Sequence, residues 1–257
     1  GVISSGDKML STYIRDVYKE SETQELADAI EDIASAIDTN GWASAGIYCF
    51  WNPENNEILY IGLARDLSNR FKEHNGLKAC KESSCKKRQI REWFESHDYL
   101  GYSILVQSQL SQPEIAINKD KIVQPLAAFL YDPLDAISQT EGLLIETERR
   151  LNNGFYKWNK ISGDSRGKEK ARSEHTELTE LFTNKRKDCF VAYNSIRQIS
   201  ADATIETFEL YLHGVRQMMA LENWSFKKAW SIVPDYYAEK ERIIEQDYIP
   251  ELSELLR

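Results

Sequence analysis

Residues 46–74 constrain the fold of this chain more than any other stretch of its sequence. Residues 45–51 (Ala-Gly-Ile-Tyr-Cys-Phe-Trp) and residues 57–62 (Glu-Ile-Leu-Tyr-Ile-Gly) are rich in apolar, β-branched and aromatic side chains, which is typical of β-strands. Between them, residues 52–56 (Asn-Pro-Glu-Asn-Asn) have turn chemistry, because proline presets φ and asparagine tolerates left-handed geometry. The pattern therefore predicts an antiparallel hairpin.

A helix is predicted directly after the hairpin, over residues 64–74. Apolar and ring side chains recur there at helical spacing, at Leu63, Leu67, Phe71 and His74. Asp66 suits the first turn of a helix. Arg70 and His74 are four residues apart, so they share one face of the predicted helix.

Each strand of the hairpin carries one tyrosine, Tyr48 in the first and Tyr60 in the second. Antiparallel pairing can bring two such phenols to one surface. We therefore expect Tyr48 and Tyr60 to meet Arg70 and His74 at the corner between hairpin and helix.

The distribution of charge qualifies the acidic composition of the chain. The net charge is −9, which by itself argues against a nucleic-acid partner. Residues 65–91, however, hold nine basic and three acidic residues, whereas residues 1–45 hold three and nine, and residues 200–257 hold six and eleven. Phosphate binding depends on local Lys and Arg, so a positive surface is expected beside the hairpin. The alternative is a cluster of solvated charges without a ligand.

Hydropathy and cysteine usage indicate in which cellular compartment the protein is expected. No run approaches the roughly 20 apolar residues that a membrane helix needs, and the N-terminus lacks a secretion-signal pattern. The four cysteines, Cys49, Cys80, Cys85 and Cys189, are too few and too scattered for a disulfide scaffold. A reducing cytoplasm is the simpler expectation.

Outside the corner, the chain is predicted to be mostly helical. The expected elements are helices over residues 8–18, 25–37, 86–97, 124–130, 138–151, 169–199 and 205–221 and beyond Pro234, a strand over 99–107 and a polar loop over 108–125. In the helix over 138–151, Ser138 and Glu141 have capping-box spacing. Glu141 is therefore expected in the first turn, where capping is the alternative to a role in chemistry.

The two tripeptides Gly46-Ile47-Tyr48 and Tyr60-Ile61-Gly62, followed by Arg70 and His74, resemble the GIY-YIG endonuclease superfamily. The resemblance covers roughly residues 43–160. It implies an α+β fold, a small three-stranded antiparallel sheet flanked by helices, here with N-terminal helices and an all-α C-terminal extension. We expect N-terminal helices over 1–42, the nuclease domain over 43–162 and a helical C-terminal domain over 163–257.

The resemblance also implies metal-dependent hydrolysis of DNA phosphodiester bonds. Tyr48 would act as general base or position the water, although an unperturbed phenol with a pKa of about 10 is a poor base, so nearby cations would have to favour the phenolate. Tyr60 would hydrogen-bond the phosphate or the water, and Arg70 would clamp phosphate oxygens. His74 would accept a proton from Tyr48 or hydrogen-bond it, or it is a surface or half-buried helix residue without a role.

The late site residues follow from the same resemblance. Glu141, in the pattern Glu-x-x-x-Ile, matches the carboxylate that holds one Mg²⁺ or Mn²⁺, and a lone Glu suffices because magnesium keeps several waters. Asn159 matches the family asparagine by its aromatic context, and Asn153 matches it by a shorter spacing. Lys86 and Lys87 could also approach the site. A zinc site formed by His74, Cys80 and Cys85 is an alternative without an evident fourth ligand.

Among the branches of the superfamily, a restriction or phage-defence nuclease fits the chain best, with DNA as the partner. The helical extension is expected to mediate homodimerisation or docking to another protein, and no membrane is involved. The alternative is a partner-dependent subunit that keeps the fold and binds nucleic acid or protein with little catalysis.

Overall fold

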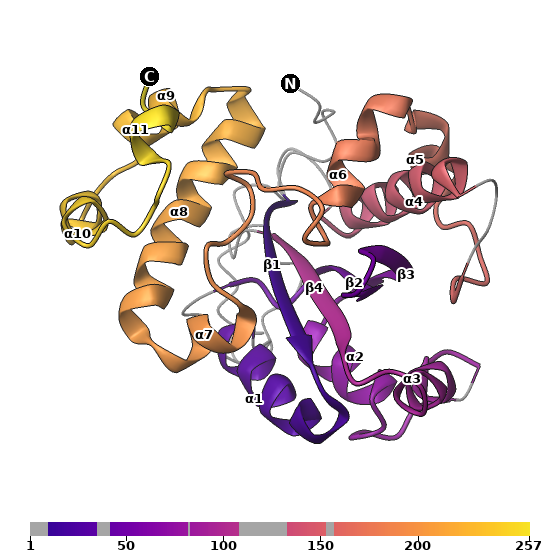
Figure 1. Ribbon diagram of the computed structural model, residues 1–257. Coiled ribbons are helices and arrows are strands. Elements are labelled where there is room, and N and C mark those ends of the chain that lie inside the picture. The colour runs from indigo at the N-terminus through magenta and orange to yellow at the C-terminus, as the bar shows by residue number, and fades with distance from the viewer. Residues whose placement is uncertain (1–9, 35–41, 82, 108–132, 153–156) are drawn as a thin grey trace, which may run out of the picture.

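The computed structural model describes residues 10–34, 42–81, 83–107, 133–152 and 157–257. A four-stranded antiparallel sheet lies at the centre, and helices cover both of its faces (Figure 1). The predicted α+β class is confirmed, with one strand more than expected.

The hairpin is present as predicted. Strands β2 (Gly46–Asn52) and β3 (Glu57–Ala64) pair antiparallel. In the turn, Asn56 has a φ of 60°, and the side chain of Asn52 accepts a 2.9 Å hydrogen bond from the backbone N–H of Glu54. The asparagines thus supply the turn geometry that joins the strands.

The N-terminal segment was predicted wrongly. Strand β1 (Leu10–Tyr18) replaces the helix expected over residues 8–18. It pairs with β4 (Leu100–Gln107), the predicted third strand, which lies between β1 and β2 in the order β1-β4-β2-β3. Nearly every side chain of β1 is buried, so the strand lacks the apolar–polar alternation that would mark it in the sequence.

Three of the predicted helices cover one face of the sheet. They are α1 (Thr23–Ile33), α2 (Leu67–His74) and α3 (Lys87–Phe94), and the 3-10 helix η1 (Glu20–Glu22) precedes them. The Asp66 side chain caps α2 by accepting a 2.9 Å hydrogen bond from the N–H of Asn69. Buried side chains of these elements and the strands share one core, including Ile14, Leu26, Ile30, Phe50, Phe71, Ile90 and Ile104.

Helix α4 (Pro133–Leu151) packs on the opposite face, with Leu143 and Leu144 fully buried. The helix begins at Pro133, well before Ser138. Ser138 is therefore not an N-cap, and Glu141 does not lie in the first turn. The capping-box interpretation of Glu141 is wrong, because the helix extends further toward the N-terminus than its apolar pattern indicated.

The single helix expected over residues 169–199 is also wrong. Short helices stand there instead: α5 (Ser165–Lys170), the 3-10 helix η5 (Ser173–His175), α6 (Thr176–Glu180) and α7 (Ile196–Ala201). The chain is not helical at Leu181, Phe182 and Val191. Their side chains are in the core on the α4 side of the sheet. Burial against the sheet thus overrides local helix propensity.

The remaining helices follow the prediction more closely. Helix α8 (Ala203–Glu222) confirms the helix over 205–221, and Asp202 caps it. The last helices are α9 (Phe226–Ile232), α10 (Glu239–Glu245) and α11 (Leu252–Leu255), with Pro250 between the last two. They gather around their own core, which includes Phe208, Leu212, Val215, Ala229 and Ile243.

The C-terminal segment is joined to the sheet through β1. The N–H of Tyr13 donates to the Phe190 carbonyl (2.9 Å), and the Tyr13 carbonyl accepts from the N–H of Ala192 (2.8 Å). On α8, which runs beside β1 (Figure 1), His213 Nδ1 lies 2.6 Å from the Thr12 hydroxyl. The division into 1–42, 43–162 and 163–257 stays a prediction, and these contacts cross both of its boundaries.

The predicted loop over 108–125, the helix over 124–130 and Asn153 lie outside the described residues. Within the described ranges, the chain has no helix that combines the length and apolarity needed to span a membrane.

Candidate active site

The hydroxyl oxygen of Tyr48 is the point at which the predicted side chains meet. Tyr48 lies on β2 and is buried. Its Oη is 2.7 Å from Nε2 of His74 and 3.3 Å from Nε of Arg70, both on α2. The Tyr60 ring on β3 is adjacent, with 5.7 Å between the two ring centroids. The four residues expected at the hairpin–helix corner are therefore together.

Gly62 makes this close packing sterically possible. It lies opposite Tyr48 across the hairpin. A Cβ on Gly62 would lie 2.6 Å from Tyr48 Oη and 2.8 Å from the Tyr60 ring. Both distances are well inside van der Waals contact, so any side chain at position 62 would displace the two phenols.

The hydrogen bonds of His74 fix its tautomer. Nδ1 accepts a 2.8 Å hydrogen bond from the backbone N–H of Lys86, so this nitrogen carries no proton. In the neutral ring the proton is then on Nε2, which donates to Tyr48. Burial, with the charges of Arg70 and Lys86, lowers the pKa of His74 to about 2. His74 is thus a neutral donor to Tyr48, and the geometry favours hydrogen bonding over proton acceptance.

Both tyrosines are neutral phenols in this environment. Burial raises the pKa of Tyr48 well above its ordinary value, Tyr60 adds to this, and Arg70 opposes it. Burial also raises the pKa of Tyr60. Because the Tyr48 oxygen already accepts from His74 and Arg70, two donors are in place that would stabilise a phenolate if one formed.

Arg70 has hydrogen-bonding capacity beyond its structural contacts. Besides Tyr48, it donates from Nη1 to Glu73 Oε2 (2.8 Å) and from Nη2 to the Ser84 carbonyl (2.6 Å). A guanidinium carries five N–H groups, more than these three hydrogen bonds use, and Tyr60 is a further hydrogen-bond partner of Arg70. The planar fork of an Arg side chain suits two oxygens of one phosphate.

Lys86 is a further cation at the site. Its residue is buried, and its ammonium lies 4.6 Å from the centroid of the Tyr60 ring. Burial lowers the pKa of Lys86, and the charges of Lys160 and Arg70 lower it further. The family resemblance indicated that Lys86 or Lys87 could approach the site. The roles of the Lys86 amide and the Ser84 carbonyl had no sequence signal, because any residue supplies those groups.

The edge of β3 brings the two late residues to the corner. Strand β3 is an edge strand of the sheet. At every second residue, its backbone N–H and carbonyl therefore pair with no neighbouring strand. Asn159 binds both groups of Ile61, accepting from its N–H (3.0 Å) and donating to its carbonyl (2.7 Å). Two residues further, the Leu63 N–H donates to Glu141 Oε1 (3.2 Å). Glu141 and Asn159 thus flank the strand that carries Tyr60.

Glu141 fits the expected cation ligand by its donor set. Its second carboxylate oxygen makes no hydrogen bond to the described residues. Burial raises the pKa of Glu141 to about 7, the Leu63 hydrogen bond opposes this, and Asp164 adds to it. The described ranges hold no group of three or more His, Cys, Asp or Glu suited to a metal. A single carboxylate suits Mg²⁺ that keeps its waters and binds substrate phosphate.

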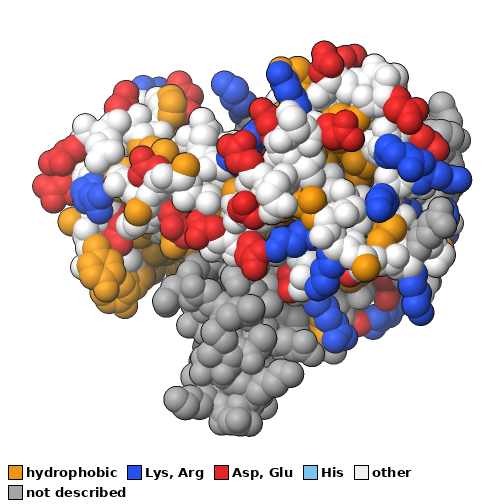
Figure 2. All heavy atoms as spheres, turned by 90° about the horizontal axis from the view of Figure 1, so that it is seen from below, with side chains coloured by type: hydrophobic (Ala, Val, Ile, Leu, Met, Phe, Trp, Pro, Cys, Tyr) orange, Lys and Arg blue, Asp and Glu red, His pale blue; other side chains and the backbone are white. Residues whose placement is uncertain are grey.

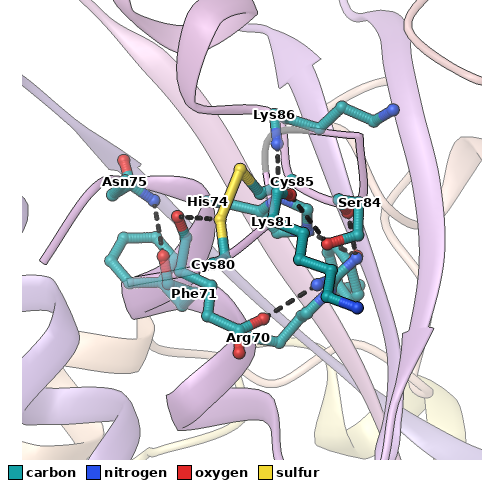
Figure 3. The surroundings of a disulfide bond; sticks show 11 residues. Arg70, Phe71, His74, Asn75, Cys80, Lys81, Ser84, Cys85 and Lys86 are labelled. Carbon is teal, nitrogen blue, oxygen red and sulfur yellow. Dashed lines mark hydrogen bonds and ion pairs between the residues drawn. A yellow bond between two sulfur atoms is a disulfide. The ribbon is translucent and has the colours of Figure 1, made fainter. Parts of the chain in front are cut away.

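Cys80 and Cys85 form a disulfide between α2 and α3 (Figure 3). No sequence pattern predicted this pair, and Cys49 and Cys189 are free. The alternative of a zinc site is not supported, because both ring nitrogens of His74 are engaged and the two sulfurs are bonded to each other.

In this structure, the hairpin of an antiparallel sheet packs two tyrosines against an Arg and a His of the next helix. This is the class of structure that the sequence resemblance implied. Residues 44–104 match the family model of the GIY-YIG catalytic domain. This match confirms the resemblance to that superfamily and supports a nuclease-type function. No curated protein and no solved structure gives a significant match to this chain.

Proposed function

We propose that this protein is a metal-dependent endonuclease that hydrolyses DNA phosphodiester bonds. One observation carries the proposal: a buried tyrosine oxygen receives hydrogen bonds from a neutral histidine and from an arginine whose side chain is partly exposed. Such a site can hold a phosphate and accept a proton beside it. The GIY-YIG domain supports the nuclease class.

Tyr48 is the group that we propose to handle the proton of the attacking water. In the free protein its pKa is raised by burial, so the phenol is neutral. Loss of the Tyr48 proton to solvent would be favoured by the positive charge of a divalent cation held by Glu141, and the donors His74 and Arg70 already surround that oxygen. The phenolate then accepts the water proton as general base.

Arg70 and Tyr60 act on the phosphate in this proposal. The guanidinium of Arg70 binds phosphoryl oxygens, with a bidentate geometry that the single ammonium of Lys cannot reproduce. Tyr60 lies next to Tyr48 and donates its hydroxyl proton to the phosphate or the water. Both contacts stabilise charge that develops in the transition state.

Glu141 is the proposed ligand of one Mg²⁺ or Mn²⁺ ion. When bound, this cation supplies positive charge to the phosphoryl oxygens and the leaving group. Asn159 holds both the N–H and the carbonyl of Ile61, so its proposed role is to position β3, and with it Tyr60.

A cationic hollow beside the corner supports DNA as the substrate. It has a volume of about 630 Å³, and its lining includes Lys78, Lys87, Arg88 and Arg91. Viewed from below, Lys and Arg side chains gather toward the right of the molecule, whereas Asp and Glu are frequent over the C-terminal helices at the left (Figure 2). Phosphates along a bound strand would neutralise the cations.

Restriction or phage defence is the biological role that we propose. Homing enzymes of the superfamily usually carry a basic, extended tail, whereas residues 200–257 hold eleven acidic and six basic residues and are largely helical. The same acidic helices suit contact with a second protein or a second copy better than contact with DNA.

Plasmid nicking tests the proposal. Wild type with Mg²⁺ should nick supercoiled DNA, and Arg70→Ala should lower the rate by at least about 10²-fold. Arg70→Lys should recover little, because a point charge does not replace the bidentate fork. Lys227→Ala, a substitution on α9, is the matched loss of a cation and should be neutral. Equal nicking by wild type and Arg70→Ala, or none with any divalent metal, favours the non-catalytic binding subunit.

A further inference from the structure

The Cys80–Cys85 disulfide closes the segment that leads from the end of α2 to the start of α3 (Figure 3). The Cα atoms of the pair are 6.5 Å apart, and Cys85 is buried. The described side chains between them, Lys81, Ser83 and Ser84, are exposed. The disulfide is thus the main apolar group that attaches this polar loop to the rest of the protein.

Two backbone groups on either side of Cys85 contact the candidate active site. The Ser84 carbonyl accepts from Nη2 of Arg70 at 2.6 Å, and the Lys86 N–H donates to Nδ1 of His74 at 2.8 Å. The position of Cys85 therefore determines where the Ser84 carbonyl and the Lys86 N–H lie. These groups are the partners of Arg70 and His74, the two α2 side chains that contact Tyr48.

The contact from Lys86 has a specific consequence for His74. Because the amide occupies Nδ1, the ring proton must lie on Nε2, where it reaches the Tyr48 oxygen at 2.7 Å. If the amide moves away, either nitrogen can carry the proton. In the other tautomer Tyr48 loses a donor and faces an acceptor.

We propose that the Cys80–Cys85 pair is a redox-controlled positioning element: the disulfide holds Ser84 and Lys86 so that Arg70 and His74 are correctly oriented, and reduction lowers the rate of DNA cleavage. This inference rests on the proposed function. Reduction breaks the Sγ–Sγ bond and transfers two electrons and two protons from a dithiol, which itself becomes a disulfide. The product is two thiols on a loop with greater conformational freedom.

Cys80 is only half-buried, so a reductant can approach the disulfide from its side. Both cysteines line the hollow of about 630 Å³ that also contains Lys78 and Lys87. Without the disulfide, the turn retains the hydrogen bonds of the Ser84 N–H and hydroxyl to the Lys81 carbonyl, each 2.9 Å. Two local bonds of this kind contribute little against chain entropy, so the reduced loop does not hold its active geometry.

The test compares the oxidised and the reduced protein in plasmid nicking with Mg²⁺. Dithiothreitol should slow wild type at least about tenfold, since small displacements of positioning groups have effects of this size, and glutathione disulfide should restore the rate. A Cys80→Ser/Cys85→Ser variant should be slow and unresponsive. Cys189→Ser, which removes a free thiol, should respond like wild type. Mass spectrometry after alkylation verifies the thiol state of each sample.

Equal rates for verified oxidised and reduced wild type overturn the inference, and so do free thiols at both positions in protein treated with glutathione disulfide. If wild type nicks in neither state, the proposed function fails, and ¹⁵N NMR of His74 still decides whether the disulfide positions His74. The oxidised protein should show a single Nε2–H tautomer, and the reduced protein a mixture. An unchanged His74 spectrum overturns the proposal whether or not DNA is cut.

Discussion

His74 donates from Nε2 to the hydroxyl oxygen of Tyr48 across 2.7 Å, while the amide of Lys86 holds its other nitrogen. Tyr48→Phe removes that oxygen and is expected to lower single-turnover nicking about 10²–10⁴-fold, the range of general-base catalysis. His74→Ala keeps the phenol but removes one donor. It should cost less, about 10–10²-fold, and add little in a Tyr48→Phe background, because the two groups act as a unit.

Tyr102→Phe is the control for the loss of a buried phenol. Tyr102 is fully buried, its ring centroid lies 6.2 Å from that of Tyr48, and its hydroxyl has no hydrogen-bond partner among the described residues. Its removal should leave nicking unchanged. A loss as large as that of Tyr48→Phe would assign the effect to packing rather than to the Tyr48 oxygen.

Glu141→Gln should separate metal binding from folding. The amide oxygen of Gln can still accept from the Leu63 N–H, which bonds Glu141 at 3.2 Å, so thermal stability should stay near that of wild type. Loss of the charge should lower Mg²⁺-dependent nicking at least about 10²-fold and weaken Mg²⁺ binding in calorimetry. Glu148→Gln changes a carboxylate of α4 that bonds Asn152 and should retain activity. Full activity of Glu141→Gln would exclude Glu141 as the ligand.

The corner could be predicted because its parts are local in sequence: a hairpin, its turn and the next helix place Tyr48, Tyr60, Arg70 and His74 together whatever the rest of the chain does. The edge of β3 could not be derived in this way. Its contacts join Ile61 to Asn159 and Leu63 to Glu141 across 98 and 78 residues, and only the family resemblance indicated them. The prediction for β1 failed because both faces of the strand are buried, so its sequence lacks the apolar–polar alternation with a period of two residues.

Substitution of basic residues that line the cationic hollow should weaken DNA binding without changing the dependence of binding on DNA sequence. Lys87 and Arg91 line the hollow and are exposed. Lys87→Ala with Arg91→Ala should make the slope of log K against log salt shallower by about 0.9 for each phosphate that is no longer neutralised. Binding of a short duplex in Ca²⁺, measured by fluorescence anisotropy between low and moderate salt, gives this slope. Lys227→Ala with Lys228→Ala on α9 is the charge-matched control, and an equal change there would contradict a local surface.

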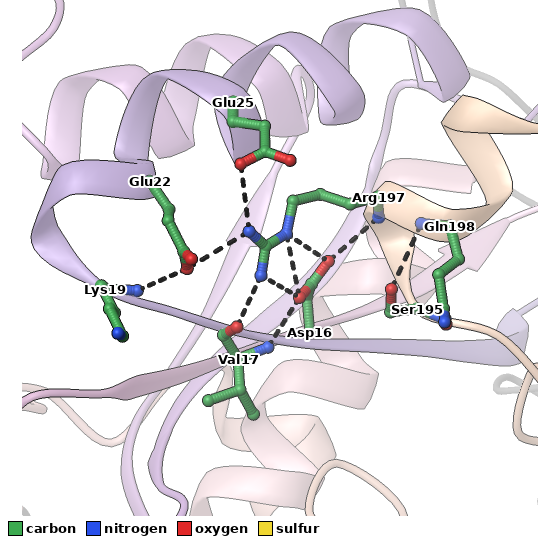
Figure 4. Close-up of polar contacts among 8 residues, drawn as sticks. All are labelled: Asp16, Val17, Lys19, Glu22, Glu25, Ser195, Arg197 and Gln198. Atoms are coloured by element: carbon green, nitrogen blue, oxygen red, sulfur yellow. Dashed lines mark hydrogen bonds and ion pairs between the residues drawn. The ribbon is translucent and has the colours of Figure 1, made fainter.

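A buried ion pair should make α7 important for stability. Arg197 on α7 contacts Asp16 of β1 (3.0 Å), and it also contacts Glu22 and Glu25 (Figure 4). Arg197→Met leaves the buried Asp16 carboxylate without its cation and should lower the free energy of unfolding by about 3 kcal/mol. Asp16→Asn in the same chain should recover part of this loss. Urea denaturation measures both.

The exposed pair of Arg88 and Glu92 (3.8 Å) is the comparison for that ion pair. Because solvent screens both side chains, Arg88→Met should change the free energy of unfolding by less than about 1 kcal/mol. Similar decreases in stability for Arg197→Met and Arg88→Met would show that burial of Asp16 does not govern the stability of this ion pair.

His213 should make the protein less stable in mild acid. It is buried between the Thr12 hydroxyl and the Gln107 carbonyl, and burial, with the charge of Arg216, lowers its pKa from the ordinary 6.5 to about 3. Below pH 6.5 the unfolded chain binds a proton that the folded protein excludes. The free energy of unfolding should therefore fall by about 1.4 kcal/mol per pH unit from this residue, about 2 kcal/mol between pH 6.5 and 5. His213→Gln should be less stable at pH 7.5 but lose correspondingly less on acidification, as measured by urea denaturation at both pH values. Parallel pH profiles for the two proteins would mean that His213 accepts a proton in the folded state.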